Sequence, residues 1–299
     1  MRVRRGAADL MLVATVTLWA LNFTVSKYVL THGLEPLSFS TTRYLAATLI
    51  FVGITRIGEG SLAVRARDVP FLLGCGVILF ANQLGFVYAL HFTTASTTAL
   101  LFGSLPIFTA LFAALTGVER LTRRFAAAAA LSFAGVALVA LGSGGELSGD
   151  LGGDLLALSG AATWGLYSVA ISPLMERYSP YRISVVMLGV TTLMLATAGV
   201  PQLASQDWPS GRLLWAGFVF AVIGPLVVTN VLWFRAIHRV GPSRASMFAN
   251  LQPFLAAVFA LLLLSESLSW IQVLGGIAIG VGIVASRRPR VRVVAAPAE

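Results

Sequence analysis

The chain has 299 residues, of which 57% are hydrophobic and only 11% charged, with a formal net charge of +9 and a single cysteine. Soluble domains carry about 25% charged residues, so the composition excludes an ordinary water-soluble protein and indicates one embedded in lipid. The lone Cys75 excludes a disulfide framework. The basic residues lie in short segments between apolar runs, whereas nucleic-acid binding needs one contiguous basic face, so we expect no nucleic-acid partner.

Apolar runs long enough to cross a bilayer dominate the chain. A membrane helix needs roughly 20 mainly apolar residues, and ten such runs predict an all-α integral membrane protein with ten transmembrane helices. The predicted helices span about 9–29, 37–56, 69–90, 94–116, 124–143, 154–173, 181–199, 213–235, 243–264 and 269–286. The first run follows a basic start, as in a signal peptide, but no small-residue cleavage site follows it. We therefore predict a retained helix.

The distribution of basic residues predicts the orientation. If the N-terminus is cytoplasmic, all but three of the 21 Lys and Arg residues fall on the cytoplasmic side. The exceptions are Lys27, Arg43 and Arg212. Cytoplasmic loops are enriched in Lys and Arg. We therefore expect a multi-pass protein of the bacterial inner (plasma) membrane with both termini in the cytoplasm.

The chain repeats itself at a constant offset. His91, Ser96, Pro106, Glu119 and Gly135 recur as His238, Ser243, Pro253, Glu266 and Gly282. The predicted organisation is a first repeat over 1–143, an external Gly/Ser-rich linker over 144–153, a second repeat over 154–286 and a basic cytoplasmic tail over 287–299.

Five helices in each repeat give the second copy the opposite orientation in the membrane. Glu119 and Glu266 then end equivalent helices on opposite sides. Inverted repeats place a central site near the bilayer midplane and permit alternating access. The predicted fold is therefore two inverted five-helix repeats around a central cavity.

The order of short motifs, present twice, resembles the EamA family of the drug/metabolite transporter superfamily over residues 9 to 286. The first copy carries Trp19-Ala-Leu-Asn22, Lys27, Pro36, Arg43, Ala95-Ser96, Leu105-Pro106, Glu119-Arg-Leu-Thr122 and Gly135. The second carries Trp164-Gly165, Pro180, Ser243, Asn250-Leu-Gln-Pro253, Glu266-Ser-Leu-Ser269 and Gly275-Gly276. The resemblance implies a ten-helix inner-membrane carrier, commonly an exporter of amino acids, related metabolites or drugs.

Polar and aromatic side chains within the predicted helices are candidates for the cavity, because polar groups at membrane depth are costly unless they face the bundle interior. Helix-to-helix hydrogen bonding or core packing remains the alternative for each. The predicted substrate-binding residues are Trp19, Asn22, Asn82, Gln83, Tyr88, Trp164, Tyr167, Ser168, Asn230 and Trp233. Tyr88 lies near the outer end of its helix, where an aromatic side chain also serves as an interface anchor.

Lys27 and Arg43 are the basic residues expected at membrane depth, and both are possible contacts for a substrate charge. Lys27 could instead extend to the interface. Arg43 could bind a carboxylate through its planar guanidinium or cap helix carbonyls. They align roughly with Ser172 and Met187, so any charged function belongs to one repeat.

Three prolines, Pro106, Pro225 and Pro253, interrupt predicted helices and are candidate hinges. Asn250 and Gln252 are candidate partners for the carbonyl that Pro253 frees. The spacing of Gly276 and Gly280 indicates close helix contact, which we expect within a monomer rather than in a dimer.

The predicted function is a transmembrane carrier, an exporter of small metabolites such as amino acids or drugs that works by alternating access. We expect no enzymatic activity, cofactor or metal. The predicted spans hold acidic residues only at their ends, Asp9 and Asp154, so a carboxylate proton relay is missing. An intramembrane enzyme and a non-transporting scaffold subunit are the alternatives, but the chain has no HExxH, GxSxG or P-loop motif.

Overall fold

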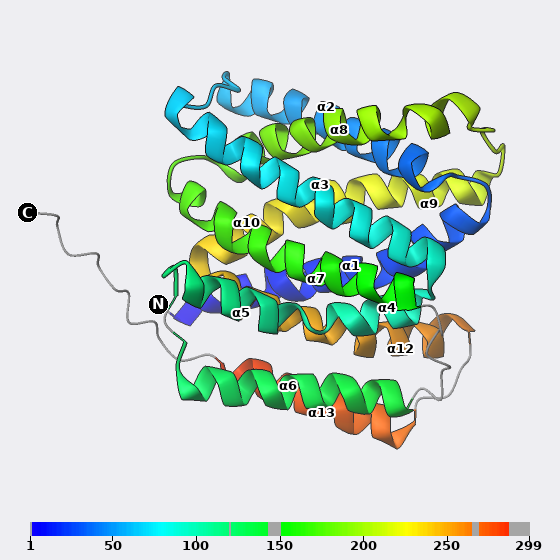
Figure 1. Cartoon of the computed structure of the whole chain (residues 1–299). Helices are drawn as coiled ribbons and strands as arrows, with labels where there is room; N and C mark the ends of the chain where they lie inside the picture. Colours follow the sequence, from blue (N-terminus) through cyan, green and yellow to red (C-terminus); the bar gives the residue numbers. More distant parts are fainter. Residues whose placement is uncertain (1, 120, 143–150, 265–268, 287–299) are drawn as a thin grey trace, which may run out of the picture.

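The described part of the protein is built from helices. The computed structural model describes residues 2–119, 121–142, 151–264 and 269–286, and these residues contain no strand (Figure 1). Seven helical spans of the described residues are long and apolar enough to cross a membrane. This agrees with the predicted all-α membrane protein, while the count of ten crossings stays a prediction.

Helices of the first half of the chain fall on the predicted apolar runs. They are α1 (Arg2–Thr31), α2 (Pro36–Glu59), η1 (Ala66–Asp68), α3 (Val69–Phe92), α4 (Ala95–Phe102), α5 (Leu105–Leu115) and α6 (Arg123–Gly142). Several begin where the local sequence favours a helix start. Pro36 occupies the first turn of α2, and the Thr94 hydroxyl caps α4 by accepting from the Thr97 backbone amide.

Helices of the second half also fall on predicted apolar runs, with three short 3-10 or π-helical segments between them. They are α7 (Leu151–Ile171), η2 (Ser172–Glu176), α8 (Pro180–Ser205), α9 (Arg212–Val222), η3 (Ile223–Val228), α10 (Thr229–Val240), α11 (Pro242–Met247), η4 (Phe248–Asn250), α12 (Leu251–Leu264) and α13 (Trp270–Ala285). α8 continues through Pro201 beyond its predicted end. Glu266 and most of the predicted linker and tail lie outside the described residues.

Two predicted helices are broken at equivalent places. The run 94–116 is divided into α4 and α5 at Gly103 and Ser104, and the run 243–264 is divided into α11 and α12 by the 3-10 turn η4. Pro106 and Pro253 each lie in the first turn of the helix after the break, where a missing backbone N–H costs least. Pro225 lies instead in η3, a π-helical segment between α9 and α10.

The helices lie side by side, with α2 and α8 along one edge of Figure 1 and α6 and α13 along the other. α6 packs most closely on α13, α2 on α8, α3 on α7, and α1 on α10. The start of α1, the connection from α2 to α3 and the end of α13 all lie at the same end of the bundle, at the left in Figure 1.

Glycines allow α6 and α13 to touch through their backbones. A Cβ atom added to Gly135 would lie 2.6 Å from the Gly275 carbonyl oxygen, and one added to Gly282 would lie 2.7 Å from the Ala128 carbonyl oxygen. Gly276 faces the ring of Phe254 on α12, and Gly280 has open space around it. Gly135, Gly275 and Gly282 thus make the close contact between these two helices of one chain, and the expectation of a monomer stays a prediction.

Replacing Gly135 with valine should lower the free energy of unfolding by ~1–3 kcal/mol or more. The new side chain would overlap backbone atoms of α13, which cannot move aside as a flexible side chain can. Gly280→Val is the matched control, since nothing lies within 4 Å of its added Cβ. Thermal unfolding of the detergent-purified variants measures the difference. Equal midpoints for the two variants would contradict this packing.

Ion pairs join the connections at the left end of the bundle in Figure 1. Arg177 pairs with Asp68 at 2.7 Å, and the Tyr178 hydroxyl donates to the same carboxylate at 2.6 Å. Arg244 at the start of α11 pairs with Asp9 of α1 at 2.5 Å. The two halves of the chain are thus tied together at this end by charged side chains.

Candidate functional site

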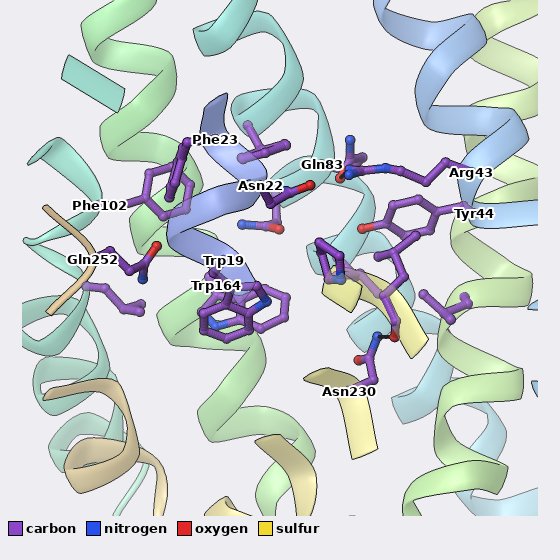
Figure 2. Close-up of a pocket in the computed structure, with 17 residues that line it drawn as sticks. Trp19, Asn22, Phe23, Arg43, Tyr44, Gln83, Phe102, Trp164, Asn230 and Gln252 are labelled. Atoms are coloured by element: carbon purple, nitrogen blue, oxygen red, sulfur yellow. Dashed lines mark hydrogen bonds between the residues drawn. The ribbon is translucent and has the colours of Figure 1, made fainter. Parts of the chain in front are cut away.

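A cavity lies in the centre of the bundle, between helices of both halves of the chain (Figure 2). The volume that the centre of a water-sized sphere can occupy in this cavity is about 80 Å³. By the same measure, one buried water needs only roughly 10–15 Å³. It can therefore hold a small solute. Its lining comprises Trp19, Asn22, Phe23, Arg43, Tyr44, Leu79, Asn82, Gln83, Phe86, Phe102, Leu105, Trp164, Leu188, Pro225, Leu226, Asn230 and Gln252.

Tryptophan rings form one wall of this cavity. The Trp19 ring of α1 lies edge-on to Trp164 of α7, with 5.2 Å between centroids, and 4.9 Å from the ring of Trp233 on α10. The Trp19 indole N–H donates to the Thr229 hydroxyl at 3.1 Å, and that hydroxyl donates to the Pro225 carbonyl oxygen. Trp19 of α1 is therefore linked to the π-helical segment through Thr229 of α10, and Trp164 of α7 packs against Trp19.

Three asparagines line the cavity from α1, α3 and α10. The Asn82 amide donates to the Gly160 carbonyl oxygen at 2.8 Å, and the Asn230 amide donates to the Leu226 carbonyl oxygen at 2.5 Å. The Asn22 side-chain oxygen accepts from Ser26. Each asparagine thus has one hydrogen-bond partner that fixes its orientation. Its remaining donor and acceptor positions are available to a solute.

Arg43 reaches the cavity from α2 and is only 2% exposed. Its Nη2 donates to the Gln83 side-chain oxygen at 2.9 Å, and Gln83 in turn donates to the Ser40 hydroxyl at 2.9 Å. In the described part of the chain the guanidinium hydrogen-bonds no helix carbonyl, although capping such carbonyls was one of the two roles considered from the sequence. Its partner is a neutral amide side chain.

Seven of the predicted contacts line this cavity: Trp19, Asn22, Asn82, Gln83, Trp164, Asn230 and Arg43. The other five lie outside the lining. Trp233 and Ser168 are buried behind it and joined by an indole-to-hydroxyl hydrogen bond of 3.3 Å. Tyr88 interacts with Gln202 of α8, and Lys27 donates to the Leu90 and Thr93 carbonyl oxygens at the end of α3.

Several lining residues were missed from the sequence because they are apolar in a chain that is apolar throughout. Phe23, Phe86 and Phe102 form one cluster with ring centroids 5.5 to 6.2 Å apart. Gln252 gave a usable signal as a polar group at membrane depth, but we assigned it to the carbonyl freed by Pro253. Asn250, assigned likewise, donates to Ser132 of α6.

Replacing Tyr167 with phenylalanine should stabilise the protein by up to ~1–3 kcal/mol and leave transport unchanged. Its hydroxyl is fully buried, has no hydrogen-bond partner among the residues that the structure describes and lies outside the cavity lining, so its removal relieves a desolvation cost. Ser168→Ala is the control of opposite sign, because it leaves the buried Trp233 N–H unpaired. Thermal unfolding and transport rates test both, and a Tyr167→Phe variant that unfolds earlier or transports less would contradict this placement.

The described residues contain no group of three or more His, Cys, Asp or Glu side chains that could hold a metal ion. Arg43 is the one charged side chain among the residues that line the described cavity. What the arrangement offers a solute is one guanidinium, several amides and a set of aromatic rings.

Comparisons with known proteins agree with the resemblance seen in the sequence. The model of the EamA-like transporter family matches twice, over residues 6–141 and 151–288. A probable terminal-alkyne amino-acid exporter of Streptantibioticus cattleyicolor is 27% identical over 89% of this chain and 88% of its own length. The transporter YcxC of Bacillus subtilis is 24% identical, with 84% of each chain covered.

A third relative, the inner membrane transporter YedA of Escherichia coli, is 26% identical over 82% of this chain and 80% of its own length. A solved crystal structure superposes with a TM-score of 0.76 and covers 95% of this chain and 98% of its own. Its sequence is 19% identical, so that likeness concerns the fold alone.

Proposed function

Because the chain belongs to the EamA-like transporter family, we propose that it is an exporter of small metabolites such as amino acids or drugs. It is an integral membrane protein with transporter relatives, one of them named as a probable amino-acid exporter. The observation that carries the proposal is the central cavity, whose lining comes from α1, α2, α3, α4 and α5 of one half and α7, α8, η3, α10 and α12 of the other.

The proposed architecture is ten transmembrane helices in two inverted repeats. The packing supports it, because contacts recur in reciprocal form: α1 packs on α10 as α7 packs on α3, while α2 packs on its counterpart α8 and α6 on its counterpart α13. Each half also has one helix broken ahead of a proline, Pro106 or Pro253. Rocking of one half against the other would expose the cavity alternately to each side.

The proposed location is the bacterial inner membrane with both termini in the cytoplasm. Cysteine labelling tests this orientation in a Cys75→Ser background. Ser210, exposed between α8 and α9, and Ser61, exposed between α2 and α3, lie in connections at opposite ends of the bundle (Figure 1). Ser210→Cys should react with an impermeant thiol reagent in intact cells, and Ser61→Cys only after permeabilisation. The reverse pattern would overturn the orientation.

Transport by the purified protein in liposomes tests the function. The panel contains amino acids, other carboxylates, the carboxamide of each, a phosphate monoester and several cationic drugs. Saturable flux of at least one solute above protein-free liposomes is the expected result. If no solute moves, and Trp19→Ala and Asn22→Ala change no solute resistance or release in cells, the carrier function is wrong and a scaffold role replaces it.

A further inference from the structure

Arg43 is held inside the helix bundle by aromatic rings and one amide. Its guanidinium carbon lies 4.7 Å from the Phe39 ring centroid, 5.6 Å from that of Phe86 and 5.7 Å from that of Tyr44. Rings over a guanidinium attract it through their quadrupoles but carry no net charge. The charge of Arg43 is therefore oriented by its surroundings without being neutralised.

The charge also lacks a carboxylate partner among the residues that the structure describes. The ion pairs in that part of the chain join Asp68 to Arg177, Glu59 to Arg182 and Asp9 to Arg244. Within the guanidinium, Nε and Nη1 are buried, and no described residue hydrogen-bonds them. A buried charge is costly unless it is paired and hydrogen-bonded, so an arginine without a carboxylate partner beside a cavity is suited to binding an anion.

Further donors lie beside Arg43 at the cavity. Tyr44 and Asn22 both line the cavity, and within the described part of the chain the side-chain hydrogen bond of Asn22 engages its oxygen and leaves its amide nitrogen available. Figure 2 shows the guanidinium, the Tyr44 hydroxyl and the Asn22 side chain directed toward the same region of the cavity. Carboxylates accept several such bonds, and a guanidinium matches their geometry.

We propose that Arg43 binds the carboxylate of the transported solute, so that the substrates are singly charged carboxylates or zwitterions bearing one. The proposal rests on the proposed export function and narrows its substrate class. One arginine is the only charged group of the described lining, so it neutralises a single negative charge. A phosphate monoester carries ≈ −1.5 to −2 at neutral pH and would leave excess charge in the membrane interior.

The remaining lining fits the apolar body of such a solute. Phe23, Phe86 and Phe102 gather on one side of the cavity and the Trp19–Trp164 wall on another. Apolar pockets with a few placed polar groups bind small molecules by burying their apolar surface and fixing one polar end. Arg43 would bind the carboxylate end of the solute, and the aromatic rings would contact its apolar body.

The liposome panel tests this assignment, because it holds each carboxylate beside its carboxamide. Wild-type protein should transport carboxylates faster than their carboxamides by at least ~tenfold, the discrimination expected from hydrogen bonds to a charged group. Arg43→Gln should bring that ratio close to one, and Arg43→Lys should retain part of it. Arg212→Gln, which removes an equal charge from an exposed position at the start of α9, should leave the ratio unchanged.

The outcomes separate the two proposals. Equal transport of carboxylates and carboxamides by the wild type, or an equal loss of both in Arg43→Gln, overturns the assignment while the carrier function stands. Faster transport of the phosphate monoester overturns the singly charged class. If Arg43→Gln does not fold, Tyr44→Phe replaces it, and a reduced ratio in that variant supports the assignment whereas an unchanged one overturns it. If the protein transports no solute of the panel, the proposed carrier function itself is contradicted.

Discussion

Replacing Trp19 with alanine should reduce transport by at least ~tenfold at limiting solute concentration. The side chain touches the rings of Trp164 and Trp233, and its N–H bonds Thr229 beside the π-helical segment. Aromatic pairs contribute ≈ 0.5–1.5 kcal/mol each beyond the burial of their surface. Truncation of a fully buried tryptophan costs ~3–5 kcal/mol, which is the upper bound for the half-buried Trp19. Loss of this wall therefore changes both the shape of the cavity and the position of α10.

Intermediate and control variants identify the cause of that loss. Trp19→Phe keeps the ring contacts and removes only the hydrogen bond to Thr229, which is expected to cost ~0.5–1.5 kcal/mol. Trp270→Ala removes a tryptophan of α13 that is 71% exposed and should transport normally. The initial transport rate of each variant is divided by the amount of protein that is monodisperse after purification, so that loss of folded protein is not counted as loss of transport. A Trp19→Ala variant that transports like Trp270→Ala would contradict a role of this wall in solute binding.

Linking α1 covalently to α11 at the end that carries Asp9 and Arg244 should stop transport. The two side chains form an ion pair of 2.5 Å in this structure, and alternating access requires this end of the bundle to open. In a Cys75→Ser background, Asp9→Cys with Arg244→Cys supplies two thiols for a short bifunctional thiosulfonate reagent. Cross-linked protein should lose flux, and a reductant should restore it.

Single-cysteine variants treated with the same reagent are the controls, because they receive the modification without the link. The double variant is also assayed before treatment, which separates loss of the ion pair from loss of motion. Continued flux through fully cross-linked protein would mean that these helices need not separate during transport, and the proposed opening at this end would be wrong.

The family and the helical fold could be read from the sequence for a physical reason. Hydrocarbon cannot hydrogen-bond a polypeptide backbone, so an apolar run of sufficient length has to satisfy its backbone groups internally, and a helix does so. The starts of α2, α8 and α13 agree with their prolines and capping residues, including the Ser269–Gln272 capping box. The doubled motifs likewise agree with the two family matches.

The rotation of each helix about its axis could not be read from the sequence, because side chains that face lipid and side chains that face the cavity are equally apolar here. Phe23, Phe86 and Phe102 are of the same type as residues on lipid-facing surfaces, yet the packing of α1, α3 and α4 brings them together around the cavity. Only helix-to-helix contacts fix such rotations.

Partners of long polar side chains were also decided by the tertiary structure. Lys27 and Arg43 are basic residues on neighbouring helices, and both were predicted from the sequence as possible contacts for a substrate charge. Lys27 ends on the backbone carbonyls of α3, whereas Arg43 ends at the cavity beside Gln83. Composition thus determined that this is a membrane protein, and the internal repeat determined that it has two related halves. The packing of α1, α2 and α3 decided which cation reaches the cavity, because a charge at membrane depth has to pair with whatever acceptor its neighbours present.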